Sequence, residues 1–211
     1  MNKKDKEIFL DIENHLLNDK KPSLYLEKLL KDGVLDKYPF SVIGDLKTVE
    51  QNPKYHPEGN VFNHTMMVVD EGAQNREKSH NKRAFMWTLL LHDIGKKPTT
   101  KMRKGKLTSY NHDTVGKEMA RKFLEYFNED EGFIEEVTGL VKWHMQSLFV
   151  AKNSRFKNVG EMLDDVDKNE IVLVAMADRL GRGRQSKIER EETMNDIRKF
   201  EKVINDAYIN N

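Results

Sequence analysis

Histidine and aspartate residues stand beside apolar segments at several points along the chain. His64 lies in VFNHTMMVVD, His92 and Asp93 end the apolar run TLLL, and Asp178 lies in IVLVAMADRL. Burying a carboxylate is costly unless a cation accompanies it. Arg179 is turned about 100° away from Asp178 around a helix and is not an obvious partner. Imidazole and carboxylate ligands without thiolates suit Mn, Ni, Co, Fe, Mg or Zn, so the pattern predicts a site for a divalent metal.

A metal ion in such a site has a definite use in catalysis. It lowers the pKa of a bound water, so that hydroxide forms at neutral pH, and it neutralises charge on a phosphoryl oxygen. His144 falls on the apolar face of its own helical segment and also points inward. For a single histidine, a buried core position is the commoner explanation. Several inward imidazoles and carboxylates on different helices favour a shared metal site.

The elements that must position these residues are helices, because apolar residues recur with helical spacing along most of the chain. The expected class is therefore all-α. Residues 34–60 contain three prolines and two glycines and read mainly as irregular connection, with a short helix possible around 40–50. Residues 96–112 read as a polar, basic loop. The expected helices are 3–18, a second beginning near Pro22 and ending at Gly33, 61–73, 81–95, 113–128, 131–147, 159–165, 168–180 and 188–207.

Composition limits the classes of function. The 211 residues contain 36 Lys and Arg against 35 Asp and Glu, so net charge alone does not indicate a nucleic-acid partner. The absence of cysteine excludes disulfides, thiolate catalysis and cysteine-ligated metals. Because no apolar run approaches the length of a membrane span, we expect a cytoplasmic protein without a membrane partner.

The ordered set of histidines and aspartates resembles the HD superfamily of metal-dependent phosphohydrolases. The pattern H…HD…D is present, and LLLHDIGK is a specific local signature of that superfamily. The segments VEQNPKYHPEGNVFNHTMMVVD, LLLHDIGKKPTTKMRKGKLTSYNHDTVGKEMA and ADRLGRGR are similar to the HD domain of bacterial tRNA nucleotidyltransferases. Together the likeness covers roughly residues 33–184. No Gly-rich segment followed by a D-x-D pair is found, so CCA addition is not expected of this chain.

The resemblance implies a helical HD bundle at 34–211 preceded by a helical extension at 1–33. It implies a first metal held by His64, His92, Asp93 and Asp178. In two-metal members the aspartate of the HD pair bridges both ions, and His112 and His144 stand where the further ligands would be. One ion and two ions remain equally open. A bridging Asp93 would also position the attacking water, which gives it a catalytic role.

Basic residues follow the presumed ligands. Lys96 comes directly after the HD motif and is the first choice for gripping and stabilising the substrate phosphate. Six basic residues and no acidic one lie between Ile94 and His112. Arg179 and Arg182 follow Asp178, together with Arg184 and Lys187, and are candidates for binding an anionic substrate. For any single lysine other than Lys96, a solvated loop is the favoured explanation of the charge. Tyr110 is a weak candidate for stacking on a base.

The implied activity is hydrolysis of phosphomonoesters or 2′,3′-cyclic phosphodiesters on nucleotides or RNA ends. One alternative is a nucleotidase or nucleoside triphosphatase for small molecules. A second alternative is a non-catalytic module that binds nucleotides or RNA and keeps the metal for structure. The N-terminal helices could pack on the core, contact substrate or mediate self-association, and the sequence does not choose among these roles.

Overall fold

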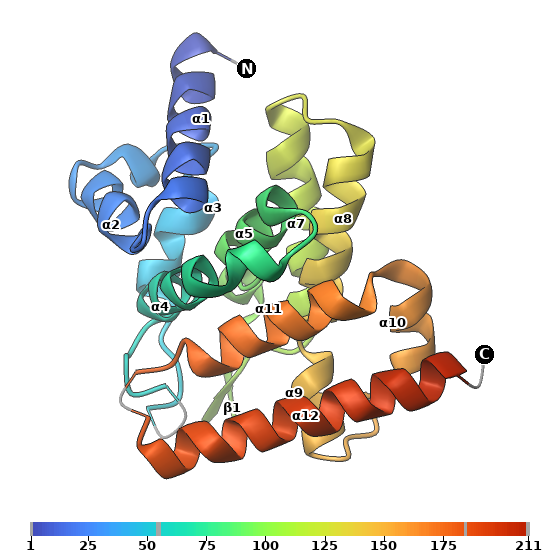
Figure 1. The fold of residues 1–211 in the computed structure, drawn as a ribbon. Helices are drawn as coiled ribbons and strands as arrows, with labels where there is room; N and C mark the ends of the chain where they lie inside the picture. The colour runs from blue at the N-terminus through green and yellow to red at the C-terminus, as the bar shows by residue number, and fades with distance from the viewer. Residues whose placement is uncertain (1, 54–55, 184, 210–211) are drawn as a thin grey trace.

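The computed structural model of the protein describes residues 2–53, 56–183 and 185–209. The expected all-α class is confirmed, with one short β-hairpin added. Figure 1 shows the helices gathered around a central group, with a long C-terminal helix crossing one end. The elements are α1 (Lys3–Asn18), α2 (Ser23–Lys31), the 3-10 turn η1 (Val34–Asp36), α3 (Ser41–Gly44), the 3-10 turn η2 (Asp45–Thr48), α4 (Val61–Asn75), the 3-10 turn η3 (Arg76–Lys78), α5 (Lys82–Leu91), α6 (Lys96–Thr99), β1 (Lys101–Arg103), β2 (Lys106–Thr108), α7 (His112–Tyr126), α8 (Glu131–Trp143), α9 (Gln146–Ala151), α10 (Val159–Asp165), α11 (Lys168–Leu180) and α12 (Lys187–Ile209).

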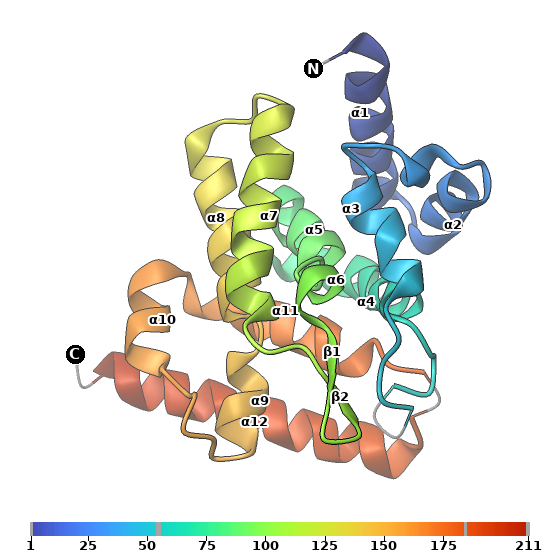
Figure 2. The same ribbon diagram turned by 180° about the vertical axis from the view of Figure 1, so that it is seen from behind.

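The centre of the molecule is formed by α4, α5, α8 and α11. Helix α5 is buried along its length and contacts α4, α8 and α11, while α7 packs along α8 (Figures 1 and 2). Side-chain caps fix where these helices begin: the side chain of Asn60 accepts from the amide of Asn63 at the start of α4, and Asp167 caps α11 in the same way. These starting points determine which residues face the centre.

The N-terminal helices share their core with the rest of the chain. The ring of Phe9 on α1 stacks on Trp87 of α5 at 4.4 Å between centroids and on Phe127 at 4.3 Å. The indole N–H of Trp87 donates to Glu13 on α1, and the Arg83 guanidinium donates to the same carboxylate. Stacked aromatic rings with satisfied polar edges attach α1 firmly to the bundle.

Two segments differ from the sequence-based expectation. The segment 96–112, expected as a loop, contains the short helix α6 and the hairpin β1–β2, in which Met102 pairs with Leu107. Lys104 and Gly105 both have positive φ, as a two-residue hairpin turn requires. The helix expected over 131–147 ends at Trp143, and a separate helix α9 begins at Gln146. Because of this break, the side chains of α9 do not continue the faces of α8.

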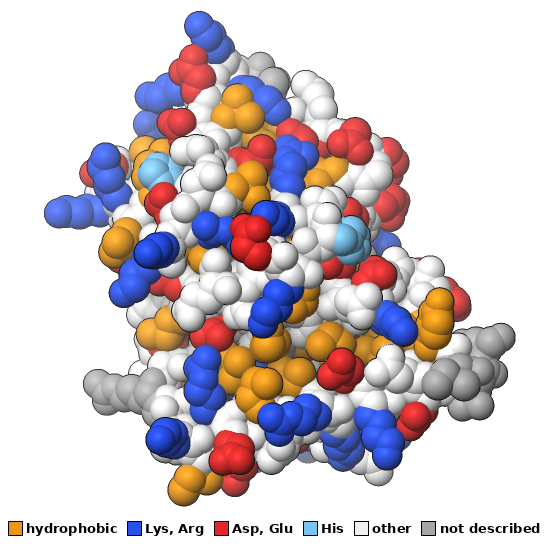
Figure 3. Space-filling model, viewed as in Figure 1, with side chains coloured by type: hydrophobic (Ala, Val, Ile, Leu, Met, Phe, Trp, Pro, Cys, Tyr) orange, Lys and Arg blue, Asp and Glu red, His pale blue; other side chains and the backbone are white. Residues whose placement is uncertain are grey.

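Charge is distributed rather than concentrated on the face of Figure 3. Acidic and basic side chains are interspersed there, with apolar side chains between them. This matches the near balance of positive and negative residues in the sequence. Among the described residues, none of the helices combines the length and hydropathy that a bilayer-spanning segment needs.

Gly95 allows the segment after α5 to lie against α7. Its φ is −66°, an ordinary helical value, so the backbone conformation does not call for a glycine here. The requirement is instead one of space. A Cβ atom on Gly95 would lie 2.6 Å from the backbone nitrogen of Gly116 and would also meet the carbonyl of His112. The backbones on the two sides therefore touch only because Gly95 has no side chain.

We expect Gly95→Ala to lower the free energy of unfolding by about 1–3 kcal/mol, because overpacking forces backbone shifts of that cost. Gly160→Ala is the matched control, since a Cβ on Gly160 meets nothing within 4 Å and its φ is not positive. That control should leave stability unchanged or raise it by up to about 1 kcal/mol. Urea denaturation of both variants measures the difference; equal stabilities would contradict the close-approach argument.

Candidate metal centre

Six buried side chains from five parts of the fold converge at one point. His64 comes from α4, His92 and Asp93 from the turn after α5, and His112, His144 and Asp178 from α7, the end of α8 and α11. None of the six is more than 7% exposed. The helix ends matter here: α5 stops at Leu91, so that the adjacent residues His92 and Asp93 both turn toward the centre. The structure thus brings together all six residues for which a ligand role was predicted.

Asp93 lies between two pairs of histidines. Its Oδ2 atom is 3.2 Å from Nε2 of His92 and 3.9 Å from Nε2 of His64. Its Oδ1 atom is 3.5 Å from Nε2 of His112 and 3.7 Å from Nε2 of His144. The two carboxylate oxygens therefore face two adjoining sets of donors.

The donors form two groups, each compact enough to hold one ion. His64, His92 and Asp178 offer ligand atoms within 4.8 Å of one another, and so do Asp93, His112 and His144. In the first group, Oδ1 of Asp178 lies 3.0 Å from Nε2 of His64 and 3.9 Å from Nε2 of His92. The arrangement can accommodate one or two divalent ions, with Asp93 between them.

Hydrogen bonds on the outer side of the imidazoles orient them inward. His92, His112 and His144 each place Nδ1 at 2.7 to 2.8 Å from the backbone carbonyl three residues earlier. A carbonyl can only accept, so each Nδ1 carries the proton and donates it. The lone pair of Nε2 is then directed at the centre, as a metal ligand requires.

Several buried polar atoms at the centre are suited to binding a cation. Within the described part of the chain, Nε2 of His92 and both carboxylate oxygens of Asp93 are buried without a hydrogen-bond partner. Nζ of Lys96 forms an ion pair with Oδ2 of Asp93 at 2.7 Å. Buried atoms of this kind are costly in a native fold unless something binds them. The chemistry of the donor set, nitrogen and oxygen without sulfur, fits a divalent ion.

The electrostatic environment keeps the carboxylates ionised. Burial alone would raise the pKa of Asp93, but Lys96 and His92 hold that pKa well below its usual range. Burial would likewise raise the pKa of Asp178, and the hydrogen bond with His64 lowers it. Both residues are therefore anionic, which is the form that binds a cation.

The histidines divide into two electrostatic groups. Burial lowers the pKa of His112, and burial together with the charges of His112 and His92 lowers the pKa of His144 to about 4. Both are neutral near pH 7 and can bind metal. Burial would lower the pKa of His64, but hydrogen bonding to Asp178 and Glu58 raises it. A divalent ion beside Asp178 would therefore compete with a proton on His64.

Glu58 is a functional candidate that the sequence reading missed. Its carboxylate is fully buried, and Oε1 lies 2.9 Å from Nδ1 of His56 and 3.2 Å from Nδ1 of His64. Oε2 accepts from the amide of Gly183, close to the end of α11. Its pKa is well below the usual range, because the hydrogen bonds to His56 and His64 outweigh its burial. The segment YHPEGN carried the available signal, an acidic residue six positions before the first histidine ligand.

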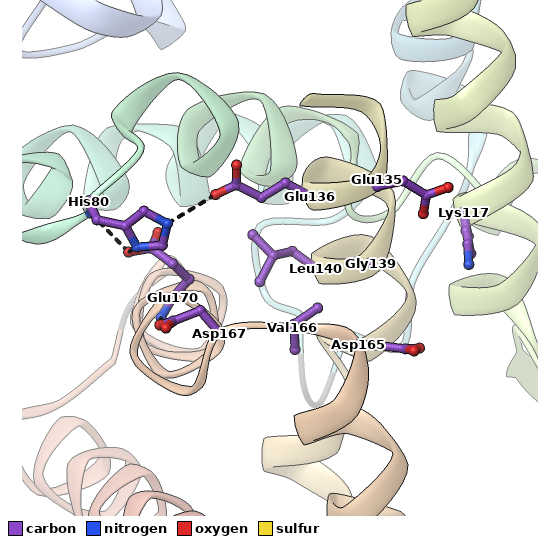
Figure 4. Close-up of a pocket in the computed structure, with 10 residues that line it drawn as sticks. All are labelled: His80, Lys117, Glu135, Glu136, Gly139, Leu140, Asp165, Val166, Asp167 and Glu170. Carbon is purple, nitrogen blue, oxygen red and sulfur yellow. Dashed lines mark hydrogen bonds and ion pairs between the residues drawn. The ribbon is translucent and has the colours of Figure 1, made fainter. Parts of the chain in front are cut away.

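A second cluster of similar composition differs in its bonding. His80, Asp167 and Glu170 also lie close together, beside Glu136 (Figure 4). Glu170 accepts from the hydroxyl of Ser79 at 2.6 Å and from the amide of His80 at 3.0 Å, while Asp167 caps α11. These groups have structural partners, in contrast to Asp93.

The metal centre opens into a cleft of about 1030 Å³. We call it the substrate cleft. It is lined by His64, Asp93, His112, His144 and Asp178 at one end, with Gln51, His56, Lys96, Lys106, Leu107, Tyr110, Lys142, Trp143, Phe149, Lys152, Phe156 and Arg182 among the remaining residues. Lys96 donates to the side chain of Gln51 at 2.9 Å, which holds its ammonium group beside Asp93.

The predicted substrate-binding residues lie in different parts of the structure. Lys96 and Arg182 line the substrate cleft. Arg179 does not: its buried guanidinium donates to Asp196 on α12 at 2.8 Å, so it fastens α12 to α11. The structure therefore does not bring Arg179 together with Lys96 and Arg182. Lys187 begins α12, and Arg184 lies outside the described residues.

Replacing Glu58 tests whether it positions His64. Glu58→Gln keeps the size but removes the charge, and we expect metal affinity to fall about 10- to 100-fold, as for other outer partners of metal-bound histidines. Isothermal titration with Mn²⁺ measures the affinity, and circular dichroism checks the fold. Unchanged affinity in the folded variant would show that Glu58 does not position His64. Glu136→Gln, in the cluster of Figure 4, is the matched control and should bind Mn²⁺ like the parent protein.

Comparison with known proteins adds the family. The HD domain family matches residues 61–183, more than half of the chain. Residues of this chain are 29% identical to the Multifunctional CCA protein of Haemophilus influenzae (strain PittGG) over 187 residues, which are 83% of this chain and 43% of that protein. The proteins of the same name from Mannheimia succiniciproducens and Pasteurella multocida are 29% and 27% identical, over 79% and 83% of this chain and 41% and 42% of their own lengths.

The chain thus spans less than half the length of these curated relatives. The matched region contains all six converging side chains, from His64 to Asp178. The resemblance expected from the sequence motifs is confirmed, and the chain belongs to the HD domain family of metal-dependent phosphohydrolases.

Proposed function

We propose that this protein hydrolyses phosphomonoesters or 2′,3′-cyclic phosphodiesters on nucleotides or RNA ends. The observation that carries the proposal is the position of Asp93. Its two oxygens face two groups of inward-pointing imidazoles at the inner end of an open cleft, and Lys96 lies beside it. A negative phosphoryl group entering the cleft would meet the cationic groups there.

The residues of the chain have separable tasks in this reaction. His64, His92, Asp93 and Asp178 would hold a first divalent ion, and His112 and His144 would complete a second site with Asp93. A bound ion supplies Lewis acidity toward the phosphoryl oxygens and makes water more acidic. The ammonium group of Lys96, held by Gln51 and Asp93, is placed to stabilise negative charge on phosphorus-bound oxygens.

The bond changes are those of a hydrolysis. Water forms a new bond to phosphorus, the bond to the ester oxygen breaks, and the proton from water ends on the departing oxygen. Arg182, at the wall of the cleft near Asp178, can bind a further phosphate oxygen. The likeness to the HD domain of tRNA nucleotidyltransferases supports an RNA end as substrate.

Asp93→Asn is the first test of the proposed reaction. It preserves shape but removes the charge between the two histidine pairs, so we expect phosphate release or ring opening to fall on the order of 1000-fold. The assay uses mononucleotides and 2′,3′-cyclic nucleotides with Mn²⁺, Ni²⁺, Co²⁺ or Mg²⁺. His80→Ala, from the cluster of Figure 4, is the control and should retain activity.

Retained turnover in a folded, metal-free Asp93→Asn protein would reject this mechanism. Absence of turnover by the parent protein with every metal and substrate, together with RNA binding, would instead favour a non-catalytic module. Turnover of free mononucleotides in preference to RNA ends would favour the small-molecule nucleotidase.

The number of bound ions can be tested at His144. His112 and His144 belong to the group on the Oδ1 side of Asp93, whereas His64 and His92 belong to the other. If both groups bind metal, His144→Ala should reduce bound Mn²⁺ from two ions to one without unfolding the protein. Elemental analysis after dialysis measures this. One ion in both proteins would limit the site to the first group.

A further inference from the structure

The substrate cleft continues well beyond the metal centre. Its volume of about 1030 Å³ reaches the upper end of the range for small-molecule sites. The ligand groups and Lys96 occupy one end, and the remainder runs between the hairpin side and the α9 side of the molecule. Residues of β2 and of α9 both line the cleft. Figure 2 shows these two elements below α7 and α8.

Aromatic side chains line both sides of this extension. On the hairpin side, Tyr110 is 62% exposed, and the guanidinium of Arg103 lies 4.9 Å from the centre of its ring. On the α9 side, Phe156 is 55% exposed, and Arg155 lies 5.0 Å from its ring. Phe149 lies beside Phe156, with 5.9 Å between ring centroids. Exposed rings next to arginine are suited to flat, anionic ligands.

The two chain segments that carry these rings contain basic residues and no acidic ones. Between Ile94 and His112, the hairpin segment has basic residues and no acidic one. Between Trp143 and Glu161, the segment carrying Phe149 and Phe156 has three basic residues and again none acidic. Such segments are unusual in a chain whose positive and negative residues are almost equal in number. The carboxylates of the cleft outside the metal centre, which are Glu50, Asp113 and Glu161, come from other segments.

The geometry points to a base-binding extension of the active site. Tyr110 on one wall, and Phe149 and Phe156 on the other, bind successive unpaired bases of a single-stranded oligonucleotide whose phosphorylated end lies at the metal centre. This inference rests on the proposed function, because it assigns the phosphate to that centre. The exposed ring faces require unstacked bases, which a duplex does not offer. The basic residues of the two segments lie near the phosphodiester backbone and attract its negative charge.

The test compares an oligonucleotide with a mononucleotide. The protein, with metal removed by a chelator, is titrated into a fluorescently labelled RNA hexamer with a 3′-phosphate, and binding is followed by fluorescence anisotropy. Unlabelled 3′-mononucleotide serves as the competitor. We expect the hexamer to bind more tightly than the mononucleotide. Tyr110→Ala and Phe156→Ala should each weaken hexamer binding about 5- to 150-fold, the range for loss of one stacked base. Turnover of a 2′,3′-cyclic mononucleotide with Mn²⁺ is measured separately on the same proteins.

Tyr208→Ala is the matched control. Tyr208 is 63% exposed, and Lys168 lies 4.2 Å from its ring, but it sits on α12 and does not line the substrate cleft. This variant should bind the hexamer like the parent protein. Hexamer binding that is no tighter than mononucleotide binding, or that is equal in all four proteins, would overturn the extension. Absence of turnover with intact, aromatic-dependent hexamer binding would instead reject only the proposed hydrolysis.

Discussion

A buried carboxylate in a helical bundle needs positive charge close by, and the residues around Asp93 supply it. Desolvation opposes its ionised form, while Lys96 and the imidazole of His92 favour it strongly enough to lower its pKa. Apart from the ion pair of Oδ2 with Lys96 at 2.7 Å, the two oxygens have no hydrogen-bond partner among the described residues, although most buried carboxylates in proteins do. The four histidines nearby are held with Nε2 facing the same point. A divalent cation satisfies these atoms together, which no single side chain in the cluster can do.

The helices around Asp93 meet because their ends and contacts are specified closely. Helix α5 ends at Leu91, immediately before the two adjacent ligands. The missing side chain of Gly95 lets the following turn approach α7, which begins with His112. Glu58 reaches His64 from the segment before α4 and also binds the backbone of Gly183 after α11. Glu58 thereby joins the segment around the start of α4 to the segment after α11, which is far away in the sequence.

The groups proposed to act in hydrolysis and those proposed to bind bases lie in different parts of the cleft. The inner end contains the charged and imidazole groups, whereas the outer walls contain Tyr110, Phe149 and Phe156 with basic neighbours. The hairpin and α9 provide these walls and lie outside the central helices α4, α5, α8 and α11. The ligand residues lie on or directly after α4, α5, α7, α8 and α11, so the hairpin and α9 supply none of them.

The sequence alone determined the helical class, the helices that carry the ligands and the family resemblance. Each of these depends on residues within a few positions of one another: apolar spacing buries His64 and Asp178, and LLLHDIGK is a continuous motif. Tertiary structure decided the rest. The buried guanidinium of Arg179 binds Asp196, a choice that depends on how α12 lies on α11. The division of Asp93 between two histidine pairs and the role of Glu58 are likewise set by segments far apart in the chain. Helical periodicity is a local property, but partners across a bundle are selected by packing, which a single sequence does not display.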